Sequence, residues 1–435
     1  MSAYLLQGGR IVDPAARRDE VADLLIRDGR IADETNAADA EAIDARGLVI
    51  APGFVDMHTH VREPGRADEE TIASASAAAA AGGYTAIVAM PNTDPVADTA
   101  AVVEKVWALG RETGLVDIVP AGALTRSLRG EKMADLGDMA RSPASVRLFT
   151  DDGHGVQNAL LARRAMEYLV AFDAIYAEHC EDASLAVGGQ MHEGLQSASL
   201  GLRGIPAVAE ELMAARDIAL ARLTGCRLHL LHVSTAGTVE LVRRAREEGL
   251  SVTAEATPHH FTLTDDALST YDPNLKVNPP LRSEGDRAAI AEGLADGTIE
   301  VIATDHAPHA LEEKDREFEY APPGMIGLET ALALTITNLV GPGLLSVEAA
   351  VERLSCAPAR ILGLDDHGGP LEVGRPAHVT VFDPTATWTV DRTGFYSRSS
   401  NSPFVGHTLT GRAVHTFFGG HPTLRDGAVV QEALV

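Results

Sequence analysis

The chain is poor in cysteine and contains no long apolar run. Its 435 residues include only Cys180, Cys226 and Cys356, an odd and widely spaced set that favours reduced thiols over a disulfide framework. No stretch approaches the ~18 consecutive apolar residues of a transmembrane helix. The first residues also lack the basic segment and apolar core of a secretory signal. We therefore expect a soluble, cytoplasmic protein that does not bind membranes.

Positive charge is scarce as well. The formal net charge is −26, which argues against binding to nucleic acid or anionic lipid, because both require clustered Lys and Arg. Only four of the 36 basic residues are lysines: Lys105, Lys132, Lys276 and Lys314. A basic residue inside a pocket is thus expected to have a specific role, and chemistry that needs a lysine has few candidates.

The chain does have enough apolar residues, 45%, for a large core. Its length exceeds the ~100–200 residues of an ordinary domain, although α/β barrels reach about 250 as one unit. One large domain and one smaller domain are therefore expected.

β-like segments occupy both ends of the chain, and a different pattern fills the middle. Residues 1–50 and 365–435 alternate short β-like runs with Gly, Asp and Pro turns, so we expect them to pair as one small β-sandwich domain. In residues 51–364, apolar β-like runs alternate with helical stretches. Eight such units favour a parallel (β/α)₈ TIM barrel over a doubly wound sheet, although periodicity does not exclude the latter. The eight runs lie near Val49 and at 85–90, 116–120, 145–149, 174–177, 227–231, 251–254 and 299–303.

Two histidines at alternate positions, His58 and His60, follow the first of these runs. Residues two apart on a strand point to the same side, so both imidazoles can reach one metal ion. An isolated His-x-His is equally consistent with a turn that carries two surface histidines. The residues at the ends of the other strands decide between these two interpretations.

Polar residues recur after the later strands, where the functional residues of a barrel gather. Four histidines and two aspartates form a cluster of nitrogen and oxygen ligands, typical of Zn²⁺ with Mn²⁺, Fe²⁺ or Co²⁺ as substitutes. They are too many for one tetrahedral site with an open position, so two ions are expected. No lysine lies where it can bridge them, which leaves the pair Asp151-Asp152. The cluster is His58, His60, one Asp of that pair, His179, His232 and Asp305. His229 lies three residues before His232 inside the same run, so alternation predicts that it points to the opposite face as a packed structural histidine.

These residues carry a resemblance to a known family. The chain resembles dihydroorotases of the class I bacterial type, within the amidohydrolase superfamily, along nearly its whole length. His-x-His recurs across that superfamily, whereas its combination with Arg62, Asn92 and the Asp-Asp-Gly is much narrower. The matching motifs are 53–65 (GFVDMHTHVREPG), 90–95 (MPNTDP), 150–153 (TDDG), 179–182 (HCED), 232–235 (HVST), 257–260 (TPHH), 277–282 (VNPPLR), 303–309 (ATDHAPH) and 324–330 (GMIGLET).

The resemblance implies the reversible cyclisation of N-carbamoyl-L-aspartate to L-dihydroorotate in pyrimidine synthesis, with two zinc ions per subunit. By resemblance, His58, His60 and Asp305 hold the more buried ion, His179 and His232 hold the other, and Asp152 bridges. A hydroxide between the ions is the expected nucleophile, and Asp305 the general acid and base. The expected substrate-binding residues are His60, Arg62, Asn92, Asn278, His309, Pro323 and Gly324.

Two other functions compete with this interpretation. An allantoinase or hydantoinase would use the same barrel, but those enzymes typically bridge their metals with a carboxylated lysine. An inactive homologue would serve as an assembly partner of aspartate transcarbamoylase, although such proteins usually lose metal ligands. We expect a homo-oligomer, and association with the transcarbamoylase is compatible with activity. The charged segment 310–323 either closes over substrate or is a solvated loop.

Overall fold

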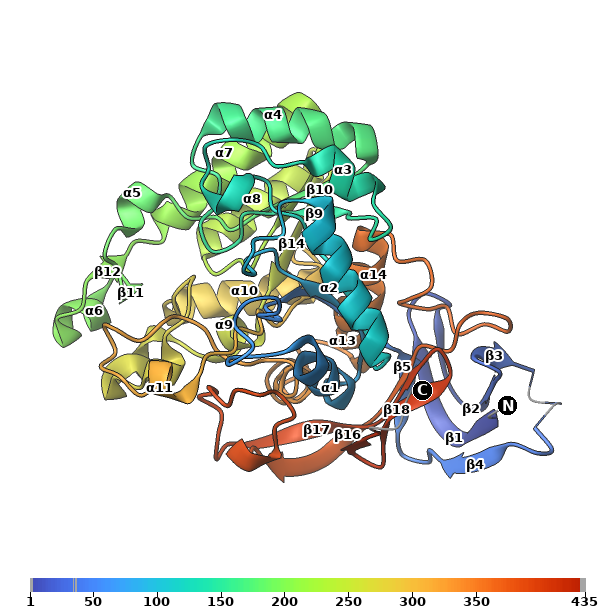
Figure 1. The fold of residues 1–435 in the computed structure, drawn as a ribbon. Helices are drawn as coiled ribbons and strands as arrows, with labels where there is room; N and C mark the ends of the chain where they lie inside the picture. The colour runs from blue at the N-terminus through green and yellow to red at the C-terminus, as the bar shows by residue number, and fades with distance from the viewer. Residues whose placement is uncertain (1–2, 34, 36, 431–435) are drawn as a thin grey trace.

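Eight parallel strands form a closed barrel in the middle of the chain (Figure 1). The structure is a computed structural model that describes residues 3–33, 35 and 37–430. Two sheets of three and five strands are joined at both seams by parallel bridges, between Gly122 and Phe149 and between Thr59 and His306. This confirms the predicted barrel. In order around it, the strands are β6 (Phe54–Thr59), β7 (Tyr84–Ala89), β8 (Asp117–Pro120), β9 (Leu148–Phe149), β10 (Ile175–Glu178), β13 (Arg227–Leu230), β14 (Val252–Ala256) and β15 (Val301–Ile302).

Alternate residues of the barrel strands enter different apolar clusters. On β7, Ala86 and Val88 belong to a cluster that fills the barrel, whereas Ile87 and Ala89 pack into the larger core outside it. Successive side chains on a strand point to opposite faces, so a strand buried on both faces is apolar throughout. This explains why these segments appear as continuous apolar runs in the sequence.

Helices follow the strands and cover the barrel. Most begin at a polar N-cap: Thr71 caps the alanine-rich α1, Asn158 caps α4 and Ser283 caps α10, each through its side chain. The covering helices are α1 (Ile72–Gly82), α2 (Ala100–Thr113), α3 (Leu136–Arg141), α4 (Ala159–Leu169), α7 (Val208–Thr224), α8 (Ala236–Glu247), α10 (Glu284–Asp296), α12 (Ala331–Thr335), α13 (Val347–Val351) and α14 (Ala357–Leu362).

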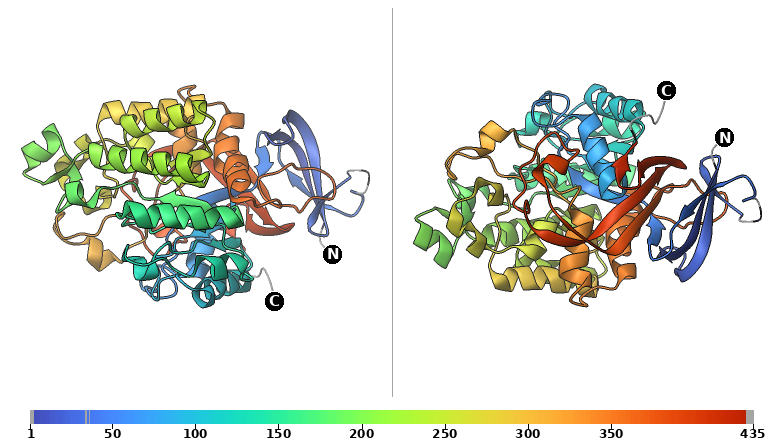
Figure 2. Two further views of the ribbon diagram at one scale, coloured as in Figure 1. Left: turned by 90° about the horizontal axis from the view of Figure 1, so that it is seen from above. Right: turned by 90° about the horizontal axis from the view of Figure 1, so that it is seen from below.

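Short elements interrupt this pattern at the carboxyl ends of the strands. One excursion, between β10 and α7, projects at the end of the molecule opposite the N-terminal strands in every view (Figure 2). The short elements are α5 (Ala183–Ala186), β11 (Met191–His192), α6 (Leu195–Leu200) and β12 (Gly204–Ile205) in the excursion, then α9 (Pro258–Thr262) and α11 (Leu311–Lys314).

The two ends of the chain share one mixed sheet of nine strands, so the expected pairing of the termini is found. The sheet bends over a common core. Tyr4 and Phe417 lie on strands three steps apart, about 14 Å in a flat sheet, yet their ring centroids are 5.4 Å apart. Its strands are β1 (Ala3–Asp13), β2 (Arg18–Arg27), β3 (Arg30–Ala32), β4 (Glu41–Asp44), β5 (Val49–Pro52), β16 (Val379–Thr389), β17 (Thr408–Phe418), β18 (His421–Arg425) and β19 (Ala428–Val429).

The apolar run around Val49 supplies two strands and not the single barrel strand that the pattern suggested. β5 pairs with β1 and β16 in the terminal sheet, and β6 begins the barrel after Gly53. A Cβ atom at Gly53 would lie 2.3 Å from the Thr85 side chain, so the chain passes between the two sheets where only glycine fits. The domain boundaries 1–50, 51–364 and 365–435 remain a prediction, and residues 1–2 and 431–435 lie outside the described part.

The segment 310–323 is anchored by two lysines, while most of its residues are exposed to solvent. Lys314 Nζ donates to the carbonyl oxygens of Pro273 and Pro322, at 2.9 and 2.8 Å. Lys276 Nζ donates to those of Phe318 and Glu319, at 2.9 and 3.1 Å. Two of the four lysines are thus buried, and they hold this segment beside the carboxyl ends of the strands.

No helix in the described part of the chain has both the length and the apolar character needed to cross a bilayer.

Lys314→Met should change how stability depends on pH. Burial lowers the pKa of Lys314 from 10.5 to about 7. Between these values the unfolded chain binds a proton that the folded chain does not, so this lysine makes the free energy of unfolding rise with pH. Methionine cannot titrate. Between pH 7 and 9, the free energy of unfolding of the wild type should therefore rise by about 2 kcal/mol more than that of the variant.

Urea denaturation of both proteins at the two pH values measures this difference. Lys105→Met, on the exposed side of α2, is the matched control and should show no such gain. A difference between wild type and Lys314→Met that stays constant with pH would contradict the prediction.

Candidate metal centre

His58 and His60 meet two carboxylates at the end of β6. The Nε2 atoms of both histidines lie 3.4 Å from Asp152 Oδ2, and His60 Nε2 lies 3.0 Å from Asp305 Oδ1. Their other ring nitrogens are engaged, His58 Nδ1 with Glu255 Oε1 at 2.7 Å and His60 Nδ1 with Asn92 Oδ1 at 2.9 Å. The two rings therefore present the same nitrogen to one point, as predicted from their alternate spacing.

A second group of ligands lies on the other side of Asp152. Asp152 Oδ1 is 3.7 Å from His179 Nδ1 and 3.3 Å from His232 Nε2, and these two nitrogens are 3.0 Å apart. His58, His60 and Asp152 form one group that can hold a metal ion, and Asp152, His179 and His232 form another. Each oxygen of Asp152 thus faces a different group, which is the geometry of a bridging carboxylate.

The neighbouring Asp151 points elsewhere. It accepts hydrogen bonds from the backbone N–H of Thr125, at 2.9 Å, and from the Thr125 hydroxyl. The spacing of the sequence left either aspartate as the shared ligand, and the structure gives that position to Asp152.

The residues present fit a pair of divalent cations. His58 Nε2 is buried and has no hydrogen-bond partner among the described residues. Burial lowers the pKa of His58, but the carboxylates of Asp152, Glu255 and Asp305 outweigh it and raise that pKa well above its usual value. Such a site stabilises positive charge, and a donor set of imidazole nitrogens and carboxylate oxygens suits zinc and related metals.

Three residues of the site have left-handed backbone conformations that side chains rarely adopt. The φ angles are 57° at Arg62, 30° at His232 and 47° at Asp305. Each such residue costs of order 1–3 kcal/mol and persists only where its surroundings hold it. These positions follow the strand ends, so the strain turns the side chains towards the barrel mouth.

A cavity of about 190 Å³ opens beside the two groups. All the predicted substrate-binding residues line it, together with every predicted metal ligand except His58. Gly324 has φ 138°, and a Cβ there would lie 2.9 Å from His309 Nε2 and 2.8 Å from Ala307 Cβ, so a larger residue would intrude on this wall. The cavity is lined by His60, Arg62, Asn92, Asp152, Gly153, His179, His232, Asn278, Asp305, Ala307, His309, Pro322, Pro323 and Gly324.

Glu69 holds two of these residues in place and was not identified from the sequence. Its carboxylate lies 3.1 Å from Arg62 Nε and 3.1 Å from His309 Nδ1. Glu69, His309 and Glu313 also meet the distance criterion of a metal group. Arg66 lies 2.8 Å from Glu313 and 3.4 Å from Glu69, so guanidinium groups already compensate these carboxylates. We interpret this third group as an ion-pair network.

Glu255 is the other important residue that sequence reasoning missed. It lies on β14, fully buried, and contacts His58 and His229. The predicted strand ended at Ala254, two residues before the end of β14 at Ala256. The only signal was a carboxylate next to an otherwise apolar run, which was not sufficient to place it.

His229 is a packed, buried histidine, as expected, but it does not lie on the face opposite the site. Its Nε2 is 3.1 Å from Glu255 Oε2, and the other oxygen of that carboxylate contacts His58. The expectation assumed an extended strand as far as His232. β13 ends at Leu230, and the positive φ of His232 interrupts the alternation.

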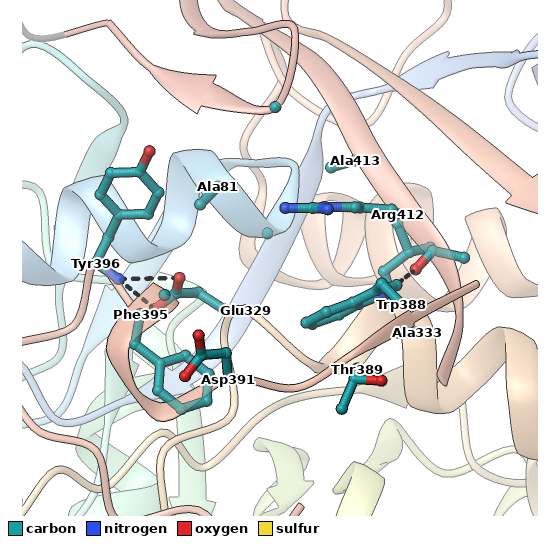
Figure 3. Close-up of a pocket in the computed structure, with 15 residues that line it drawn as sticks. Ala81, Glu329, Ala333, Trp388, Thr389, Asp391, Phe395, Tyr396, Arg412 and Ala413 are labelled. Carbon is teal, nitrogen blue, oxygen red and sulfur yellow. Dashed lines mark hydrogen bonds between the residues drawn. The ribbon is translucent and has the colours of Figure 1, made fainter. Parts of the chain in front are cut away.

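A second cavity, of about 280 Å³, lies between the terminal sheet and helices α1 and α12 (Figure 3). Glu329 lies in it and accepts hydrogen bonds from the backbone N–H groups of Tyr396 and Ser397. No histidine occurs among the described residues that line it. Of these two cavities, only the smaller one lies beside the metal-binding groups.

None of the four lysines, all within the described part, supplies a bridging group. Lys276 donates to the carbonyl oxygen of Phe318 and Lys314 to those of Pro273 and Pro322, whereas Lys105 and Lys132 are exposed. The residue that the two histidine groups share is Asp152.

Comparison with known proteins agrees with this site. A family model described as "Dihydro-orotase-like" matches residues 47–238. A dihydroorotase of Pelotomaculum thermopropionicum is 50% identical over 98% of this chain and 99% of its own length. Those of Streptomyces coelicolor and Mycobacterium tuberculosis are each 49% identical, over 98% and 94% of this chain.

Solved structures show the same fold. An L-hydantoinase (dihydropyrimidinase) from Arthrobacter aurescens aligns with a TM-score of 0.88 at 27% identity, over 99% of this chain and 98% of its own. A dihydropyrimidinase from Brevibacillus agri aligns at 0.85 with 22% identity, over 98% and 96%, which shows the amidohydrolase fold alone. The dihydroorotases are much more similar to this chain in sequence, over nearly its whole length. This similarity shows that the chain belongs to the dihydroorotase family.

Proposed function

We propose that this chain is a metal-dependent dihydroorotase that interconverts N-carbamoyl-L-aspartate and L-dihydroorotate in pyrimidine synthesis. The main support for the proposal is that one cavity combines two metal-binding groups with an arginine that can bind a carboxylate. Two histidine groups share Asp152, and Arg62 faces the same space. A cyclic amide with a carboxylate substituent needs both features.

Arg62, Asn92 and His309 are proposed to bind the substrate carboxylate. A guanidinium matches a carboxylate through two parallel hydrogen bonds. Arg62 Nε faces Glu69 and the carbonyl of Pro308, at 3.1 Å in both cases, which fixes the orientation of the guanidinium. The segment after β6 thus carries a proposed metal ligand, His60, and a proposed carboxylate-binding residue, Arg62, two positions apart.

Asn278, Pro323 and Gly324 are proposed to hold the ring. Asn278 Oδ1 is buried and has no hydrogen-bond partner among the described residues, so it can accept a bond from a ring N–H. Its Nδ2 lies 3.4 Å from His179 Nε2, which orients the amide. Gly324 exposes backbone in the wall of the cavity without a side chain.

His58, His60, Asp152, His179, His232 and Asp305 are proposed to hold two zinc ions. Bound there, the ions would polarise the amide carbonyl and lower the pKa of water at the site. Asp305 would accept the proton of the attacking water and pass it to the departing ring nitrogen. Burial opposes ionisation of Asp305, but His58 and His60 hold its pKa below its usual range, so Asp305 is ionised, the state in which a carboxylate can act as a base.

Hydantoin and allantoin hydrolysis is the competing function, since the solved neighbours include hydantoinases. Two observations favour dihydroorotate. The shared ligand is Asp152 and not a lysine, and Arg62 in the cavity would be superfluous for a ring without a carboxylate. Zinc as the metal, a homo-oligomeric state, a cytoplasmic location and association with aspartate transcarbamoylase remain parts of this proposal.

The purified protein should contain about two divalent ions per chain and hydrolyse dihydroorotate far faster than hydantoin or allantoin. Removal of the metal with a chelator should abolish turnover, and zinc should restore it. Metal analysis and assays with the three substrates test this. Metal-free protein that still turns over dihydroorotate, or a preference for hydantoin, would overturn the proposed function.

Asp305→Asn should lower kcat for dihydroorotate by about 10²–10⁴-fold, because an amide cannot accept the proton. Asparagine tolerates a left-handed conformation, so the backbone at this position should be retained. Steady-state kinetics give the effect, and an unchanged circular dichroism spectrum shows that the fold is intact. Near-normal turnover would exclude Asp305 from proton transfer.

Arg62→Lys should lower kcat/KM for dihydroorotate by about 10–100-fold, corresponding to the ~1.5–3 kcal/mol of a charged hydrogen bond. Turnover of dihydrouracil, the same ring without the carboxylate, should hardly change. Arg66→Lys is the matched control, because Arg66 also contacts Glu69 but does not line the cavity. Equal losses on both substrates would contradict a role of Arg62 in carboxylate binding.

A further inference from the structure

Glu255 connects the two metal-binding groups through one buried carboxylate. Its Oε1 accepts from His58 Nδ1 at 2.7 Å and from the backbone N–H of His232 at 3.2 Å. His58 belongs to the first group and His232 to the second. Glu255 itself is not a ligand in either group, and its side chain is fully buried inside the barrel.

The contact with His58 determines which ring nitrogen is free. An ionised carboxylate only accepts hydrogen bonds, so His58 must carry a hydrogen on Nδ1. In the neutral ring, Nε2 then carries the lone pair, and it is Nε2 that lies near Asp152 and Asp305 without a hydrogen-bond partner among the described residues. Glu255 therefore sets both the tautomer and the orientation that a metal requires.

The contact with His232 acts on the backbone. His232 has φ 30°, and its N–H donates to Glu255 Oε1. The next residue, Val233, donates its N–H to the Glu255 carbonyl oxygen at 2.9 Å. Side chain and main chain of one residue thus hold the turn that directs the His232 ring towards Asp152.

The second oxygen of Glu255 is fixed independently. His229 Nε2 is 3.1 Å from Oε2, and His229 Nδ1 is 2.8 Å from the Thr253 hydroxyl. A neutral His229 with its hydrogen on Nε2 satisfies both contacts, since Nδ1 then accepts from the hydroxyl. This chain of bonds prevents the carboxylate from rotating away from His58.

We propose that Glu255 is a positioning residue that fixes the His58 tautomer and the His232 turn, and so gives the paired site its metal affinity. The inference rests on the two-metal site of the proposed function. It extends the site to a residue that touches neither substrate nor metal, and to His229 behind it.

Metal binding to metal-free protein, measured by competition with a chromophoric chelator for Zn²⁺, tests the proposal without substrate. Glu255→Leu should weaken at least one of the two binding steps by about 10–100-fold. Glu255→Gln should weaken it less, because its amide oxygen still accepts from His58 while its NH₂ group faces His229, which can change tautomer. Wild-type affinity in Glu255→Gln would overturn the proposal, even where Glu255→Leu fails to fold.

Glu329→Gln is the matched control. Glu329 is a partly buried glutamate that accepts hydrogen bonds from backbone N–H groups in the cavity of Figure 3, and no histidine lines that cavity among the described residues. It should retain wild-type zinc affinity, and an equal loss there would assign the effect to general destabilisation. If zinc binding depends on Glu255 but the wild-type protein does not hydrolyse dihydroorotate, the proposed function is wrong and the role of Glu255 in metal binding still holds.

Discussion

The burial of charge at the mouth of the barrel is the constraint on which the rest of the site depends. His58, His60 and His179 lie with Asp152 and Asp305 at positions almost closed to solvent. An isolated buried carboxylate is strongly unfavourable unless it is paired or coordinates a metal. Asp152 meets this requirement by facing a histidine group with each oxygen. The shared carboxylate is thus the reason that two groups, and not one, can exist at this depth.

The fold supplies the rigidity that such an arrangement requires. The residues of the two histidine groups lie at the ends of β6, β9, β10 and β13, strands that belong to one closed barrel, so their mutual distances are set by backbone hydrogen bonds. The left-handed conformation of His232 is tolerated because backbone hydrogen bonds hold both of its neighbours, Leu231 to Glu178 and Val233 to Glu255. The stability of the barrel thus maintains an unfavourable backbone conformation at the site.

The sequence was sufficient for the barrel and for the two histidine groups that share Asp152, because both depend on local patterns: apolar runs of strand length and polar residues directly after them. It was insufficient wherever the answer depended on a partner far along the chain. Asp151 and Asp152 are equivalent locally, and only the bond of Asp151 to Thr125 separates them. His229 was placed on the wrong face because alternation does not report where a strand ends. Val49 appeared to begin the barrel because a run shared by two sheets has the same pattern as one long strand.

The charge balance of the cavity links metal loading to substrate binding. Four carboxylates, those of Glu69, Asp152, Glu255 and Asp305, surround a space in which Arg62 is the fixed positive charge among the lining residues. A carboxylate substrate would meet a negative field there, within a protein whose net charge is already −26. Two divalent ions reverse that balance, and because they are buried, little salt screening weakens them. In the proposed function, Arg62 would therefore recognise a substrate carboxylate once the neighbouring groups hold their metal ions, so the residues that hold the metals would also make the cavity selective for an anion.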